Sequence, residues 1–226
     1  PSGFVAPGLP VWLPLCPADY PSSFLKCGTG GLLVFGLMLA NPQLQAPPVN
    51  EHFAAGGGPY FDGPIFPFVF ICVMCGAISG FHALVSSGTT SKMVSRESHV
   101  RTIGYAAMLI EGVVGVVALL AASSLPQGDY WAINIDLSKV EKYAGTFEKM
   151  HLEPDNLAEI ERQVGGEALR GRTGGAVTLA VGMAQVLTDA LRRLTGGAVS
   201  LKGVVKYWYH FAIMFEALFI LTTIDT

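Results

Sequence analysis

Residues 102–124 read TIGYAAMLIEGVVGVVALLAASS, an apolar stretch with a single charged residue, Glu111, near its middle. The hydrocarbon core of a bilayer needs roughly 20 mostly apolar residues from one helix. The stretch therefore predicts a membrane-spanning α-helix. Because a charge in hydrocarbon is costly, the Glu111 carboxyl should face protein or water rather than lipid.

Three other segments have the same character. Residues 65–86 and 207–224 are comparable in length, and 24–40 (FLKCGTGGLLVFGLMLA) is a shorter stretch in which Lys26 can reach the interface. The whole chain is 51% hydrophobic and 14% charged, with a mean hydropathy of +0.47, unlike an ordinary soluble domain. We predict an all-α fold, a polytopic transmembrane helical bundle with four spans, in which the lipid bilayer is the solvent.

Residues 173–191 (TGGAVTLAVGMAQVLTDAL) do not fit this pattern so simply. One side of the expected helix is polar, and its apolar side is too short for a comfortable crossing. The polar stripe consists of Thr178, Gly182, Gln185 and Asp189. The segment is either a span lined by protein or water, or a re-entrant segment, and the sequence leaves both open.

The loops indicate an orientation. Residues 41–64 contain no Lys or Arg, whereas residues 87–101 contain Lys92, Arg96 and Arg101. The positive-inside tendency places the second loop in the cytoplasm, and the alternation of spans then makes 125–172 external. This mixed-charge segment predicts a solvated extramembrane region with short helices, one of them capped by Asp155. By the same rule, four basic residues favour a cytoplasmic end after residue 191: Arg192, Arg193, Lys202 and Lys206. The next loop is not part of this sequence, so the direction of the final span stays open.

Charge and cysteine content exclude several classes of protein. The net charge is −3 and no long run of Lys or Arg occurs, which excludes a nucleic-acid partner. The four cysteines lie in or beside apolar segments, so we interpret them as free thiols. Cys72 and Cys75 form a CxxC inside an apolar helix with no second ligand pair nearby. We predict no metal site and no cofactor.

The stretch 65–92, IFPFVFICVMCGAISGFHALVSSGTTSK, loses its hydrophobicity halfway. On a helix, Cys75, Ser79, His82 and Ser86 share one side. The run 86–90 favours a helix break followed by a new capped turn. We therefore expect a cavity lining with six substrate-binding residues: Ser79, Gly80, His82, Ser87, Gly88 and Thr89. Tight helix packing and a simple helix end are the alternatives.

Two carboxyl groups lie at membrane depth, Glu111 and Glu216. Together with His82 they are candidates for carrying a coupling proton, and a static interhelical hydrogen bond is the alternative. Residues 207–210 (YWYH), which precede Glu216, are typical of an aromatic belt at the interface.

Several long motifs resemble one family. They are LPVWLPLCPADYPSSFLK, FPFVFICVMCGAISGFHALVSSGTTSKMVSRES, then IGYAAMLIEGVVGVVALLAA, GGAVTLAVGMAQVL and WYHFAIMFEALFILTTIDT. In order and spacing these motifs are similar to the carbon starvation protein (CstA) family. The resemblance implies that 1–226 is part of one CstA-type transmembrane transport domain with an extramembrane segment at about 125–172. The chain starts at Pro1 and stops after an apolar run, so we expect it to be a piece of a longer protein.

The resemblance further implies a secondary transporter, not an enzyme, in the plasma (inner) membrane of a prokaryote. Such a multi-pass protein would import short peptides or small carboxylates such as pyruvate, coupled to an ion such as the proton, and would be associated with the carbon starvation response. Two alternatives remain: an intramembrane enzyme using His82 with Glu111, and a non-transporting structural subunit. Neither a His-Glu-x-x-His nor a Gly-x-Ser-x-Gly motif occurs.

The charge bias of the loops yields a test of orientation. In intact cells that express the full-length protein with its native cysteines replaced, a cysteine at Lys142 should react with a membrane-impermeant maleimide. A cysteine at Ser95 should react only after the cells are permeabilised. The opposite labelling pattern would reverse the orientation.

Overall fold

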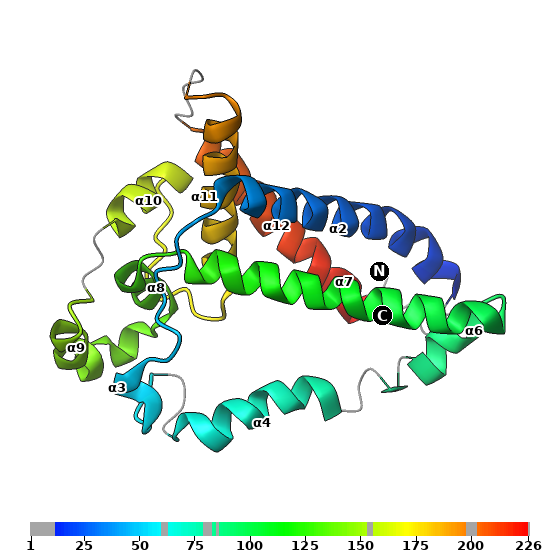
Figure 1. Ribbon diagram of the computed structural model, residues 1–226, viewed down its shortest axis with the longest axis horizontal. Coiled ribbons are helices and arrows are strands. Elements are labelled where there is room, and N and C mark those ends of the chain that lie inside the picture. Colours follow the sequence, from blue (N-terminus) through cyan, green and yellow to red (C-terminus); the bar gives the residue numbers. More distant parts are fainter. Residues whose placement is uncertain are drawn as a thin grey trace.

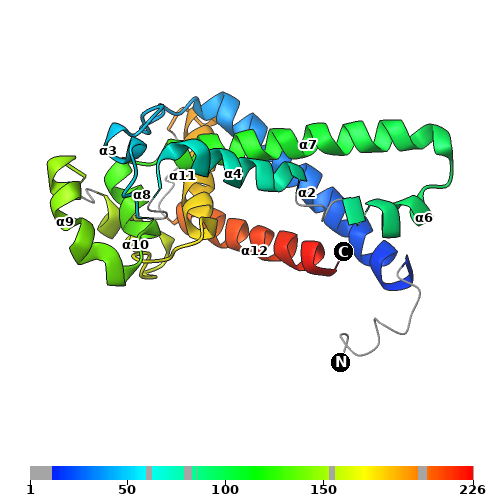
Figure 2. The same cartoon turned by 90° about the horizontal axis from the view of Figure 1, so that it is seen from below.

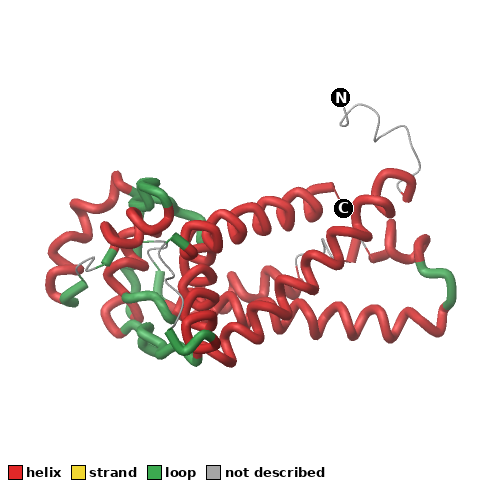
Figure 3. Tube along the Cα trace, turned by 90° about the horizontal axis from the view of Figure 1, so that it is seen from above, coloured by secondary structure: helices red, strands yellow, loops and turns green. Residues whose placement is uncertain are grey.

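Helices are the only regular elements among the described residues of this computed structural model, which are 12–59, 63–78, 83–84, 86–152, 156–197 and 203–225 (Figure 3). The predicted all-α fold is therefore confirmed. The elements are α2 (Trp12–Ala40), α3 (Glu51–Ala54), α4 (Ile65–Ile78), the π-helical turn η2 (Ser86–Thr90), α6 (Ser91–Met93), α7 (Glu97–Ser123), α8 (Gln127–Asn134), the 3-10 turn η3 (Leu137–Lys139), α9 (Val140–Lys149), α10 (Leu157–Val164), α11 (Ala176–Leu194) and α12 (Val204–Asp225).

Three long helices, α2, α7 and α12, extend away from a group of short ones (Figures 1 and 2). We call residues 125–172, which contain α8, α9 and α10, the cap. The segment Ser23–Ala40 of α2 and the whole of α7 are long and apolar enough to cross a membrane, as predicted for 24–40 and 102–124. The apolar part of α4, Ile65–Met74, is shorter than the predicted span 65–86, part of which lies outside the described residues. Helix α12 covers residues 207–224, but among the described residues only the segments in α2 and α7 are long and apolar enough for a span.

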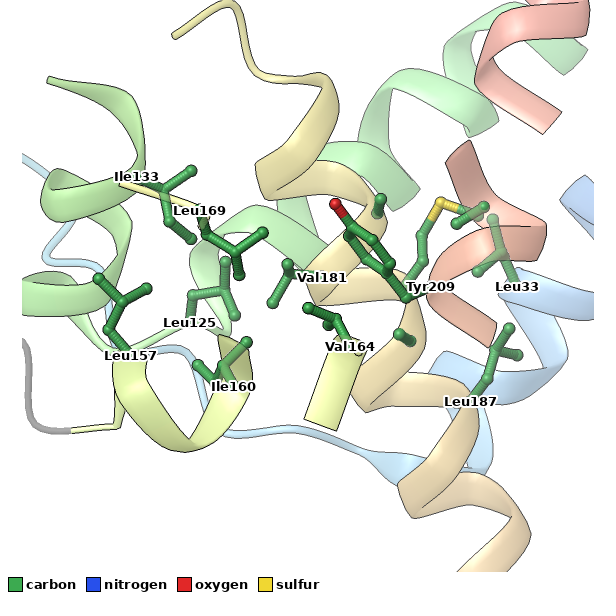
Figure 4. Packing of buried hydrophobic residues seen from close by; sticks show 14 of the residues in the cluster. Leu33, Leu125, Ile133, Leu157, Ile160, Val164, Leu169, Val181, Leu187 and Tyr209 are labelled. Carbon is green, nitrogen blue, oxygen red and sulfur yellow. The ribbon is translucent and has the colours of Figure 1, made fainter. Parts of the chain in front are cut away.

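The hydrophobic core lies where the cap meets the long helices (Figure 4). Leu125, Ile133 and Leu157 from the cap are at most 1% exposed and belong to the same cluster as Val181 of α11 and Tyr209 of α12. The middle of α7, by contrast, exposes large apolar side chains such as Leu109 (64%), Val116 (57%) and Leu119 (66%). Such a surface is unfavourable in water and suits lipid.

Helix α11 crosses the cap-side ends of the long helices instead of running beside them, and both views show this crossing (Figures 1 and 2). Two glycines allow the close approach. A Cβ at Gly182 would lie 2.6 Å from the carbonyl oxygen of Ala121 in α7, and one at Gly36 of α2 would lie 3.0 Å from Leu187. The segment 173–191 therefore does not form a span parallel to α2 and α7.

The loop 41–64 and the cap lie at the same end of the long helices, as the predicted alternation of spans requires. Lys139 donates to the Pro59 carbonyl at 3.2 Å, and Tyr143 donates to the Gly58 carbonyl at 3.0 Å. The backbone N–H of Gln45 also donates to the Ser123 carbonyl, at 2.8 Å.

Two of the basic residues after 191, Arg192 and Lys206, lie beside the cap, so the cytoplasmic end that their charge favours conflicts with the external position predicted for the cap. Arg192 and Lys206 line one groove with Arg162 and Gly165, which belong to the cap. They therefore lie on the side predicted to be external, and cannot mark a cytoplasmic end if the cap is outside. The reason is that α11 crosses the bundle end and returns to the cap. Helix α12 consequently starts on the cap side.

The start of α10 also differs from the sequence interpretation. Asn156, not Asp155, is the N-cap residue, and it makes no side-chain capping bond. Asp155 lies outside the described residues. The backbone N–H of Asn156 instead donates to Oδ1 of Asp129, a fully buried carboxylate, at 3.3 Å.

The α11–α7 crossing predicts a stability difference between two glycine substitutions. Gly→Ala improves helix propensity by up to about 1 kcal/mol in either helix. At Gly182 the new methyl group meets the Ala121 backbone, and such overpacking costs about 1–3 kcal/mol. Gly31 is a matched control, because a Cβ there meets nothing within 4 Å.

We expect Gly182→Ala to lower the melting temperature of the detergent-solubilised full-length protein and Gly31→Ala to leave it unchanged or raise it. Equal melting temperatures for the two variants would contradict the close crossing.

Candidate functional site

The predicted break at 86–90 is a π-helical turn that leads into α6. Ser87 Oγ donates to the Leu84 carbonyl at 3.2 Å, and Ser91 Oγ donates to the Ser87 carbonyl at 2.7 Å. The hydroxyl groups therefore satisfy carbonyl groups that the irregular turn leaves open. The interruption is confirmed, but the expected cap is not. Thr90 stands at the N-cap of α6 and makes no side-chain capping bond.

The proposed substrate-binding residues fall partly inside the described structure. Ser79, Gly80 and His82 lie outside it. Ser87 and Gly88 are exposed, Thr89 belongs to the same turn, and a Cβ on Gly88 would meet nothing within 4 Å. The turn lies near the end of α7 that is remote from α11 (Figure 1). It lines neither of the two grooves described below, and its role stays a prediction.

The two membrane-depth carboxyls have different surroundings. Glu111 is exposed on α7, and a Cβ on the neighbouring Gly112 or Gly115 would meet nothing within 4 Å. Glu216 of α12 is half-buried, and its Oε1 is buried without a hydrogen-bond partner among the residues that the structure describes. Leaving such an atom unpaired is unfavourable. Of these two carboxyls, Glu216 is therefore the one packed into protein.

A cluster of titratable side chains joins the cap to α12. Tyr209 donates its hydroxyl proton to Glu167 Oε2 at 3.4 Å, and His210 Nε2 lies 3.9 Å from Glu167 Oε1. His210 Nδ1 lies 2.7 Å from the Lys206 carbonyl oxygen. The sequence interpretation of 207–210 as an interfacial aromatic belt did not identify this contact, since Tyr209 is only 3% exposed and packs in the core. Glu167 was also missed. It is one of several acidic residues in an irregular loop, where no periodicity indicates a partner.

Polar grooves flank the C-terminal half of α11. One has a volume of about 990 Å³ and is lined by residues that include Thr188, Arg192 and Lys206. On the cap side, the ion pair of Arg162 with Glu159 lines this groove. Hydrogen bonds from Arg162 hold the pKa of the Glu159 carboxyl below its usual value. The other has a volume of about 470 Å³, and Gln185 and Asp189 are among the residues that line it.

The predicted polar stripe of α11 thus has three different roles. Gln185 and Asp189 face a groove, and Gly182 permits the α7 crossing. Thr178 is buried and accepts a hydrogen bond from Asn134 Nδ2, which also donates to the Tyr130 carbonyl at 2.9 Å. Half of the stripe is therefore an internal hydrogen-bonding and packing surface and not a water-lined one.

No group of three or more His, Cys, Asp or Glu residues in the described part of the chain could hold a metal ion. Cys27 and Cys72 are exposed free thiols, as predicted for them.

Comparison with known proteins assigns the chain to a family. The sequence model of the family described as "Carbon starvation protein CstA" matches residues 2–226. The chain is 46% identical to the peptide transporter CstA of Mycobacterium tuberculosis (strain H37Rv), covering 99% of this chain and 30% of that protein. It is 45% identical to the peptide transporter CstA of Escherichia coli K12, covering 99% and 32%. No solved structure matches.

A relative with a different printed name is the pyruvate/proton symporter BtsT of Escherichia coli K12, 38% identical over 98% of this chain and 34% of that protein. The chain spans about a third of the length of these relatives. All three are named as transporters, which agrees with the length and apolar composition of α7 and of Ser23–Ala40 in α2. The match over nearly all of its residues shows that the chain belongs to the carbon starvation protein CstA family.

Proposed function

We propose that the full-length protein is a secondary transporter that imports short peptides or small carboxylates such as pyruvate, in association with carbon starvation. It works as a multi-pass protein of the plasma (inner) membrane of a prokaryote, and the proton is its coupling ion. The observation that carries this proposal is the similarity, over almost the whole chain, to proteins named peptide transporter and pyruvate/proton symporter.

The residues of the chain support this proposal independently. Carboxyl groups on two membrane-depth helices, Glu111 and Glu216, are the kind of group that carries protons in transporters. His82 is the third candidate. An intramembrane enzyme is the weaker alternative, because the motifs of a nucleophile or metal site are absent from the sequence. If the protein were a purely structural subunit, the two carboxyl groups would have no role beyond packing.

For substrate binding we propose the segment around the helix break, namely Ser79, Gly80, His82, Ser87, Gly88 and Thr89. Interrupted membrane helices expose backbone groups that bind carboxylate or coordinate ions. The irregular turn at 86–90 and its exposed, open Gly88 support this placement.

Glu111→Gln tests proton coupling. The amide keeps the shape and the hydrogen bonding of the carboxyl group but cannot titrate. In proteoliposomes containing the full-length protein, we expect the variant to retain exchange of substrate and to lose accumulation driven by a proton gradient. Glu97→Gln, in the first turn of the same helix, is the control and should behave as the wild type. Accumulation by Glu111→Gln at the wild-type rate, with the same pH dependence, would reduce Glu111 to a packing residue.

Gly88→Leu tests the substrate path at the break. The new side chain has space in this chain, so membrane insertion should be normal, but it would obstruct a ligand at the turn. We expect slower uptake with an unchanged protein level in the membrane. Gly145→Leu in α9 of the cap, where a Cβ also meets nothing within 4 Å, is the control. Unchanged transport kinetics in Gly88→Leu would leave the turn as a helix terminus only.

A further inference from the structure

The smaller polar groove is formed where three distant parts of the chain meet at the cap-side end of the long helices. They are the start of the loop after α2, the residue after α7 and the C-terminal half of α11. Both α2 and α7 contact α11 (Figure 1). The groove volume of about 470 Å³ lies within the range of small-molecule sites, roughly 300–1,000 Å³.

The walls and the floor of this groove are fixed by the fold. Asn41 turns the chain at the end of α2 with a φ of 39°, which asparagine adopts more readily than most residues. The Gln45 N–H donates to the Ser123 carbonyl at 2.8 Å and so attaches the loop to the end of α7. Ala40 and Val186 form an apolar floor, 3% and 2% exposed, and belong to one core cluster. The groove is therefore formed before any ligand binds.

Four of the lining residues carry a side-chain amide: Asn41, Gln43, Gln45 and Gln185. Each amide offers a carbonyl oxygen as an acceptor and an NH₂ group as a donor. A peptide group presents the complementary pair, one N–H and one C=O. The three loop amides are exposed and Gln185 is partly exposed, so a solute can reach all four. Amide side chains in this number favour a ligand that contains peptide groups.

The same groove holds charges of both signs. Asp189, Arg192 and Arg193 line it, and Arg192 Nη1 lies 3.4 Å from Asp189 Oδ1. This ion pair is 63% and 53% exposed on its two side chains, and such surface pairs contribute little, so a ligand can replace it. A ligand with one carboxylate and one ammonium group would satisfy both signs. A monoanion such as pyruvate would leave Asp189 beside a like charge.

The spacing of the charges suits a short ligand. Asp189 and Arg193 are four residues apart on α11, or about 6 Å along the helix axis. An extended dipeptide spans at most about 7 Å. Its two charged ends can therefore meet the two side chains at the same time, whereas its peptide group lies between them, within the amide-lined part of the groove.

We propose that this groove binds short peptides with free ends and discriminates against pyruvate. Asp189 pairs with the ammonium group, Arg193 pairs with the carboxylate, and the side-chain amides bond to the peptide group. The site rests on the proposed transport function and adds to it a point of substrate recognition at the cap-side end of the bundle, away from the helix break at 86–90.

The competing explanation is that another part of the full-length polypeptide covers the groove. The charges and amides would then pair within the protein, and the end groups of a peptide would not affect binding through Asp189 or Arg193. The two explanations differ in whether the effect of each protein charge depends on the matching charge of the ligand.

The experiment measures equilibrium binding of labelled dialanine to the purified full-length protein in detergent. Competitors are N-acetyl-dialanine, which lacks the ammonium group, dialanine amide, which lacks the carboxylate, and pyruvate. Asp189→Asn and Arg193→Gln each remove one charge from an exposed side chain. Glu148→Gln and Lys149→Gln in α9 are matched controls, because both residues are exposed and neither lines the groove.

We expect the wild type to bind dialanine about tenfold more tightly than either modified peptide, in line with one charge-assisted hydrogen bond at each end. In Asp189→Asn the preference over N-acetyl-dialanine should disappear, while the preference over the amide remains. Arg193→Gln should show the reverse. Such pairwise dependence isolates the two contacts. Both control variants should keep both preferences, and pyruvate should compete weakly with the wild type.

Two results would overturn the site. One is an unchanged preference for free ends in both groove variants. The other is a cysteine at Gln43, in a background without the native cysteines, that reacts with a maleimide equally fast with and without saturating dialanine. Failure of the proposed function is distinguishable, because the wild type would then transport neither dialanine nor pyruvate in proteoliposomes, whatever the binding preferences.

Discussion

The close approach of two backbones at Gly182 is the constraint on which the arrangement of this chain depends. Helix α11 can lie against the carbonyl of Ala121 only because position 182 has no side chain. From that crossing, α11 also reaches α2 through Leu187 and contributes Val181 to the core shared with the cap and α12. One helix thus joins the ends of three long helices to the cap.

The long apolar helices could be predicted from the sequence because their apolar composition extends over many consecutive residues. The stretch 102–124 has one charge, and α7 indeed covers it. The break at 86–90 was also predictable, since glycine and hydroxyl residues in succession compete with regular helical hydrogen bonding. In both cases the relevant interactions are local in the chain.

The sequence was less informative where contacts join distant residues. The bond from Asn134 to Thr178 and the contact of Glu167 with Tyr209 connect segments more than 40 residues apart. Periodicity grouped Thr178 with Gln185 and Asp189, but only the packing of α8 on α11 separates an internal hydrogen bond from a groove lining. The position of Arg192 and Lys206 beside the cap could not be inferred for the same reason, because loop charge carries no information on a helix that crosses the bundle end.

The exposure of α7 has a consequence for the parts of the full-length protein beyond this chain. Around the middle of the helix, Leu109 and Val116 lie on one side, whereas Glu111 and Gly115 lie on another, and all four are exposed here. Acyl chains can solvate the first side but not a carboxylate. On the second side, Gly115 has no side chain. Membrane helices approach each other most closely at such small residues. We therefore expect the side of α7 that carries Leu109 and Val116 to contact lipid, and the side that carries Glu111 and Gly115 to contact another membrane helix.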